Sequence, residues 1–185
     1  VRGMDIRLDC GAYDPAFDLI VDPRVIWATY YGGDQHDVGS AVDTDADDNV
    51  YLAGSTVSAT AISTTGIFQP AIAGGRDGFI TKFDSAGNRL WCTYVGGPAN
   101  DYLESIACMG GVIVAAGQTS SANMATTGVH QTVLSGMGDM YLIRLTPAGV
   151  RQWATYYGGP DADRVSDVRV DAGGAILLAG ESGST

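Results

Sequence analysis

Asp43, Asp45 and Asp47 stand at alternate positions in one short acidic segment of the chain. Carboxylates at this spacing open calcium-binding loops, because calcium prefers hard oxygen ligands. The segment departs from an EF-hand-type loop, since Asp48 occupies the sixth position, which needs glycine, and no glutamate stands at the twelfth. Two interpretations stay open: a calcium site on the three alternating aspartates, or an acidic hairpin turn capped by its own side chains.

Two further sets of aspartates recur along the chain. Asp37, Asp101 and Asp163 each follow a Gly-Gly pair by four residues, and Asp77 and Asp139 each open an apolar run. These carboxylates are either repeated ligands for a sugar or ion, or structural acceptors for backbone N–H groups beside the Gly-Gly turn. Recurrence in every copy favours the structural role, because a binding site usually occurs once.

The residue types that perform catalysis are sparse. The two histidines, His36 and His130, have no nucleophile motif nearby, and the sequence Gly-x-Ser-x-Gly is absent. The cysteines Cys10, Cys92 and Cys108 are odd in number and lack metal-ligand spacing. We expect buried free thiols, with a Cys92–Cys108 pair as the alternative. The sequence therefore predicts no catalytic residue and no cofactor, apart from the calcium interpretation.

The elements that must position these residues are repeats. The box Trp-x-Thr-Tyr-x-Gly-Gly begins at Trp27, Trp91 and Trp153, which lie 64 and 62 residues apart. A fixed period of this length indicates a stack of similar supersecondary units. We interpret the tryptophans as packing anchors between units rather than as a platform for ligand stacking, and expect Trp91 to be buried between the first and second units.

Each repeat has the pattern of four short strands. In the first repeat we expect strands at 40–45, 50–55, 78–83 and 89–94, joined in two hairpins by turns rich in Asp, Asn and Gly. The strands carry apolar residues on both faces, so both faces must be covered. Four-stranded antiparallel sheets between neighbours of the same kind are the blades of a β-propeller.

The sequence thus predicts an all-β chain of about two and a half repeats of roughly 62–64 residues, an incomplete propeller. Four-stranded sheets are expected at about 37–96 and 101–158, with a strand at 25–31 at an edge or outside them. The repeats divide the chain into blade-forming repeats at 25–96 and 97–158 and a partial repeat at 159–185.

Five landmarks recur in a fixed order: the Trp box, an Asp, the run Asn49-Val-Tyr-Leu-Ala-Gly-Ser-Thr56, Thr-Thr-Gly-x-x-Gln, and Asp77-Gly-Phe-Ile-Thr-Lys-Phe-Asp84. In this order they resemble the bacterial secreted beta-propeller repeat family, known as SBBP repeats. The resemblance covers residues 24 to 185 and implies propeller blades in a large secreted or cell-surface protein without an assigned reaction. Residues 1–24 resemble the end of the β-rich region that commonly precedes the first such repeat, so the resemblance implies a separate region there. The chain departs from the pattern at Cys108-Met-Gly-Gly111, which replaces the Asp-containing turn.

Composition is consistent with an extracellular module, and the resemblance implies a bacterial one. The formal net charge of −11 argues against nucleic acid or an anionic membrane as the partner, because either needs a basic face. No apolar segment of membrane-spanning length is present in the sequence, and we expect no membrane insertion. Two and a half blades cannot close a ring, so we expect a piece of a longer chain, or neighbouring subunits, to supply the remaining blades.

The function expected is a non-enzymatic scaffold for binding or adhesion to an unknown protein or glycan. The long connections at 57–76 and 120–138 are the expected contact sites, because binding residues gather on loops held by rigid scaffolds. The alternative is part of an extracellular propeller enzyme, quinoprotein-like or carbohydrate-active, whose site lies largely outside this segment. The runs ending at Trp91 and Trp153 are similar to quinoprotein repeat endings, but no adjacent cysteine pair is present.

Overall fold

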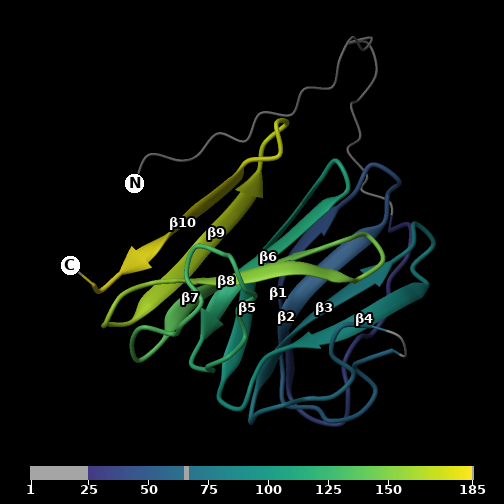
Figure 1. Ribbon diagram of the computed structural model, residues 1–185. Helices are drawn as coiled ribbons and strands as arrows, with labels where there is room; N and C mark the ends of the chain where they lie inside the picture. The colour runs from purple at the N-terminus through teal and green to yellow at the C-terminus, as the bar shows by residue number, and fades with distance from the viewer. Residues whose placement is uncertain (1–24, 65–66, 185) are drawn as a thin grey trace, which may run out of the picture.

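The computed structural model describes residues 25–64 and 67–184, and this part of the chain contains ten strands and no helix. Figure 1 shows the strands grouped into successive antiparallel sheets. The all-β prediction is confirmed. The strands are β1 Asp37–Thr44, β2 Val50–Thr56, β3 Asp77–Phe83, β4 Arg89–Val95, β5 Asp101–Met109, β6 Val112–Thr119, β7 Asp139–Leu145, β8 Arg151–Tyr157, β9 Asp163–Val170 and β10 Ile176–Ser182.

The strands form three sheets, which we call blades one, two and three. Blade one has the order β1-β2-β3-β4, blade two β5-β6-β7-β8, and blade three only β9 and β10. All pairs within a blade are antiparallel. The two predicted four-stranded sheets are therefore present, and strands from different repeats do not mix within a sheet in the described residues.

A glycine in the second strand of each blade allows a close backbone approach. The first strand bulges between Gly39 and Ala41 in blade one, and the equivalent bulges occur in blades two and three. A Cβ on Gly54 would lie 1.9 Å from the carbonyl oxygen of Val38, and one on Gly117 would lie 1.8 Å from that of Tyr102. This contact explains why an Ala-Gly pair recurs in every copy.

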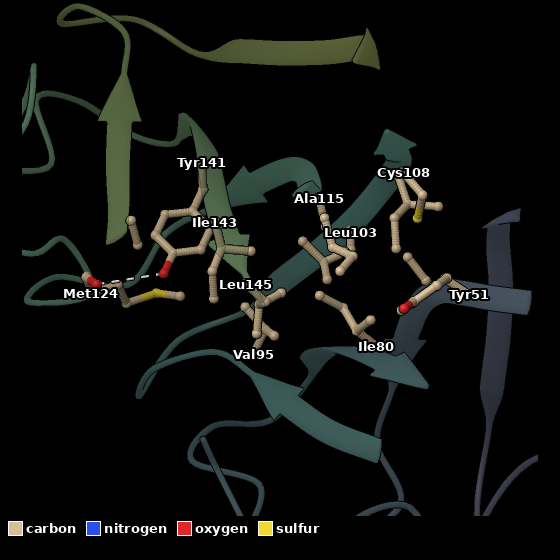
Figure 2. Close-up of a cluster of buried hydrophobic side chains, with 14 of the residues drawn as sticks. Tyr51, Ile80, Val95, Leu103, Cys108, Ala115, Met124, Tyr141, Ile143 and Leu145 are labelled. Atoms are coloured by element: carbon tan, nitrogen blue, oxygen red, sulfur yellow. Dashed lines mark hydrogen bonds between the residues drawn. The ribbon is translucent and has the colours of Figure 1, made fainter. Parts of the chain in front are cut away.

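The blades pack face to face around one continuous interior. The first strands β1, β5 and β9 contact one another in sequence, which makes them the inner strands of the array. Figure 2 shows Tyr51 and Ile80 of blade one meeting Leu103 and Ala115 of blade two in a buried cluster. A second cluster joins β6 and β7 of blade two to β9 of blade three. Both faces of blade two are thus covered, as the apolar pattern of its strands requires.

The long connections return to the outer edge of their own blade. Thr64 N–H donates to the carbonyl of Cys92 at 3.0 Å, and Tyr94 N–H donates to that of Gln69 at 3.1 Å. In blade two, Thr126 and Gln131 make the same bonds to β8. The first and last residues of the Thr-Thr-Gly-x-x-Gln motif therefore bond to the outermost strand, whose free edge would otherwise invite pairing with another chain.

One expectation was wrong. Residues 25–31 form no strand, because no described strand runs beside them to supply a hydrogen-bonded ladder. The expectation of buried free thiols is confirmed for Cys92 and Cys108, and the alternative, a Cys92–Cys108 pair, does not form. The expected region at 1–24, together with Cys10, lies outside the described residues.

Candidate functional site

The Gly-Gly loop between successive blades is held by the recurring aspartates. The carboxylate of Asp101 accepts hydrogen bonds from the N–H of Gly97 at 2.7 Å and from the hydroxyls of Thr119 and Ser121. Asp37 accepts the corresponding bond from Gly33 at 2.7 Å, and Asp163 that from Gly159 at 2.9 Å. The structure gives these residues the bonds expected of structural acceptors.

The second set of aspartates, Asp77 and Asp139, accepts hydrogen bonds from a glutamine in the long connection of the same blade. Gln69 donates through Nε2 to Asp77 at 2.9 Å and accepts through Oε1 from the N–H of Gly96 at 3.1 Å. Gln131 makes the equivalent bonds to Asp139 and Gly158 at 2.7 and 3.0 Å. The glutamine thus links the start of the third strand to the loop that leaves the fourth. Its role was missed in the sequence, although it recurs at the same place in both copies.

Burial raises the pKa of Asp77 and Asp101, despite the donors that favour the charged form. Both side chains are almost completely covered. A perturbed pKa often marks a functional site. Here, however, the carboxylates of Asp77 and Asp101 already accept hydrogen bonds from groups of the surrounding loops. These acids therefore have no face open to a substrate.

Trp91 lies at the boundary between blades one and two. Its side chain is 7% exposed, its Nε1 donates to the carbonyl of Pro147 at 3.0 Å, and its ring lies against Gly149. Both contacts are to the β7–β8 turn of the next blade. Trp27 lies against Gly87 of blade one in the same way, whereas Trp153 is half-buried and no glycine of the described residues lies against its ring.

The acidic segment forms the β1–β2 turn. Asp45 accepts hydrogen bonds from the N–H groups of Asp47 and Asn49, both at 3.0 Å, and from the hydroxyl of Tyr51 at 3.0 Å. Its carboxylate also pairs with Lys82 at 3.5 Å. Burial works to raise the pKa of Asp45, but these hydrogen bonds outweigh it and bring the pKa to about 2.

Asp43 turns away from this group toward blade two. Its Oδ2 accepts the N–H of Cys108 at 2.7 Å. Cys108 does not take the place of Asp45 in an equivalent turn, because β5 and β6 are joined by the tight pair Gly110-Gly111, both with positive φ. In the part of the chain that the structure describes, no three His, Cys, Asp or Glu side chains form a group that could hold a metal ion.

No catalytic constellation forms around the histidines or thiols of the described residues. His36 and His130 are exposed, and the nearest aromatic partner of His130 is Tyr157, with ring centroids 5.4 Å apart. Burial raises the pKa of Cys92 and of Cys108 to about 12, so both thiols are protonated near neutral pH and poor nucleophiles.

A hollow lies between blades two and three. It has a volume of about 470 Å³ and is lined by aromatic and aliphatic side chains, among them Trp153, Tyr157, Leu142 and Leu178. We call it the open groove. Its residues come from β7, β8 and His130 of the preceding connection on one side, and from β10 on the other. Sequence analysis did not predict it.

The connection at 120–138 carries exposed apolar side chains that its counterpart lacks. Val133 is 71% exposed and Met137 is 85% exposed. The equivalent residues of the first connection are Ala71 and Gly75. We call Val133 and Met137 the loop patch. A comparison of the two copies, residue by residue, would have found it.

The described residues include no helix that is both long and apolar enough to cross a membrane. No protein-family model matches the chain. The chain is similar to an uncharacterized WD repeat-containing protein of Acanthamoeba polyphaga mimivirus, with 24% identity over 210 residues that cover 99% of this chain. The chain spans about 15% of that protein's length. Together with the stacked blades, this similarity supports a repeat β-propeller scaffold.

Proposed function

We propose that the chain belongs to a non-enzymatic, secreted or cell-surface propeller of the SBBP type that binds a protein or glycan through its long connections. The observation that carries the proposal is the loop patch. The recurring polar residues are occupied inside the blades, whereas Val133 and Met137 differ between copies and face solvent. Exposed apolar side chains on a loop held by a rigid sheet are typical of contact surfaces.

Apolar contacts favour a protein partner, and methionine adapts its shape to varied surfaces. The formal charge of −11 favours a partner with a neutral or basic face. The secreted location and the bacterial origin are supported by the resemblance to SBBP repeats, while the viral relative supports the propeller alone. Protease treatment of intact source cells tests the location, because a surface protein is cleaved without lysis.

The binding role is tested by screening the purified chain against arrays of extracellular proteins and glycans, and then measuring affinity for each hit. Val133→Ser/Met137→Ser is expected to weaken binding about tenfold or more, since burying such a side chain contributes about 1.5–3 kcal/mol. Ala71→Ser in the equivalent connection is the matched control and should bind as the parent does. Equal affinity of the double variant, or no hit on either array, contradicts the proposal.

A further inference from the structure

A hollow of about 310 Å³ lies at the boundary between blades one and two, next to the Gly-Gly loop that joins them. A second hollow of about 320 Å³ shares Phe68 and Arg151 with it, and we call the two together the arginine hollow. Tyr141 and Met124, which meet at one end of the cluster in Figure 2, also line it. Phe68 comes from the connection of blade one and Arg151 from β8 of blade two, so the described residues supply both walls.

The guanidinium of Arg151 is positioned by contacts with both blades. Its Cζ lies 4.3 Å from the centroid of the Phe68 ring, which is a cation–π contact. Its Nη1 donates to the carbonyl of Met124 at 3.3 Å, so the other N–H groups are left for a ligand. A guanidinium presents its N–H groups as a planar fork that matches the two oxygens of a carboxylate. The arginine hollow thus offers a held, fork-shaped donor.

No acidic side chain neutralises Arg151 within the described residues. The chain has 21 Asp and Glu residues against 10 Lys and Arg, yet none of the residues that line the arginine hollow is an acid. The two ion pairs of the described residues join Lys82 to Asp45 and Arg169 to Asp167. The net charge of −11 repels an anion at a distance, but salt near physiological concentration screens exposed charges beyond about 8 Å. A ligand can therefore supply the carboxylate that Arg151 lacks.

The rest of the lining suits a small ring that carries hydroxyl groups. Asn123 is exposed at the hollow in the left-handed backbone region, with a φ of 63°, and its amide both donates and accepts hydrogen bonds. Ile67 and Val150 add apolar surface beside Arg151. Ligand pockets usually measure about 300–1,000 Å³, so a volume of about 310 Å³ fits one sugar unit. A sugar ring has hydroxyls for the amide and C–H groups for the apolar side chains.

We infer that the arginine hollow binds a uronic acid, a sugar whose carboxylate bonds to Arg151 while a ring hydroxyl bonds to Asn123. The arginine hollow shares no residue with the loop patch, so this inference goes beyond the proposed function and does not rest on it. The sugar acid can be a free molecule or a unit of a glycan. A uronate-containing oligosaccharide that binds more tightly than free glucuronate identifies a glycan, and equal affinity identifies the free sugar acid; either result supports the site.

The test titrates the 185-residue chain with glucuronate and follows backbone amide signals by nuclear magnetic resonance. Arg151→Gln should weaken binding about tenfold or more, because it removes a hydrogen-bonded charge. Arg151→Lys keeps the charge but loses the fork, so its affinity should be intermediate. Arg89→Gln is the matched control and should bind as the parent does. Arg89 opens β4 as Arg151 opens β8 and donates to the carbonyl of Ala61 at 3.0 Å, but no aromatic ring of the described residues lies against it.

Neutral and acyclic probes separate the parts of the ligand. Glucose keeps the ring without the carboxylate, and acetate keeps a carboxylate without the ring, so both should bind at least about tenfold more weakly than glucuronate. Thermal unfolding checks that each variant folds. A parent chain without signal shifts at tens of millimolar glucuronate overturns the inference, as does glucose binding of equal affinity or an unchanged affinity of both Arg151 variants. A glutamate-containing tripeptide that binds more tightly than glucuronate also overturns it, because the hollow would then bind an acidic protein segment.

Discussion

Replacing Trp91 with alanine tests whether the boundary between blades one and two stabilises the fold. The side chain is 7% exposed, contacts Gly149 of the next blade and lies edge-on to Tyr51 with ring centroids 6.1 Å apart. Truncating a buried tryptophan costs about 3–5 kcal/mol. The hydrogen bond to Pro147 adds little to this cost, because Pro147 is exposed and its carbonyl can bind water instead.

Trp91→Phe separates the two contributions. It keeps most of the apolar contact and removes the Nε1 donor, so its free energy of unfolding should fall by only about 1–2 kcal/mol. Urea unfolding followed by far-ultraviolet circular dichroism measures both variants, with the slopes compared to detect loss of cooperativity. An alanine variant within about 1 kcal/mol of the parent would refute the role of Trp91 as an anchor.

Three further changes probe the turn and the loop between blades. Asp45 has a pKa of about 2, below its unfolded pKa of about 4, so it stabilises the fold above pH 4 and this contribution is lost as the pH falls toward 2. Asp45→Asn should therefore flatten the acid limb of a plot of urea midpoint against pH. Calcium at millimolar concentration should leave the melting temperature unchanged, because Asp43 bonds to Cys108 of the next blade whereas Asp45 bonds within its own turn and to Tyr51. A rise in melting temperature that Asp45→Asn/Asp47→Asn abolishes would restore the calcium interpretation. Gln69→Ala should lower the free energy of unfolding by about 1–3 kcal/mol, because it leaves the Gly96 N–H and the Asp77 carboxylate each without one hydrogen-bond partner. The control Gln152→Ala changes an exposed side chain and should cost little. Equal stability of the two variants would show that water replaces the glutamine.

The repeats made the blades predictable. Two hairpins per period located the four strands of blade one to within a few residues, because turn residues and apolar runs act locally, and the repeat predicted a second four-stranded sheet at 101–158. The role of the Gly-Gly aspartates was also accessible, since a carboxylate four residues beyond a glycine pair can reach its N–H groups. The bulge opposite Gly54 was not accessible, because it depends on which strand pairs with which.

The features that sequence reasoning missed depend on contacts between distant copies. Asp43 looked like a metal ligand within its own turn, yet it bonds to Cys108, 65 residues away. The expected strand at 25–31 has the right composition but no described neighbour to pair with, and a strand needs a partner as well as a sequence. The open groove is lined by side chains from two blades, such as Trp153 of blade two and Leu178 of blade three, so it depends on how the blades pack and a list of motifs does not reveal it.

The Gly-Gly loop has a consequence for how such chains lengthen. Its two adjacent N–H groups are held from opposite sides, Gly96 by Gln69 of the blade before it and Gly97 by Asp101 of the blade after it. The next loop repeats the arrangement with Gln131 and Asp163. Every repeat thus supplies an aspartate acceptor to the loop before it and a glutamine acceptor to the loop after it. A duplicated repeat can therefore bond to the repeats on both sides of it. Tandem copying can therefore extend the array without any new interface having to evolve.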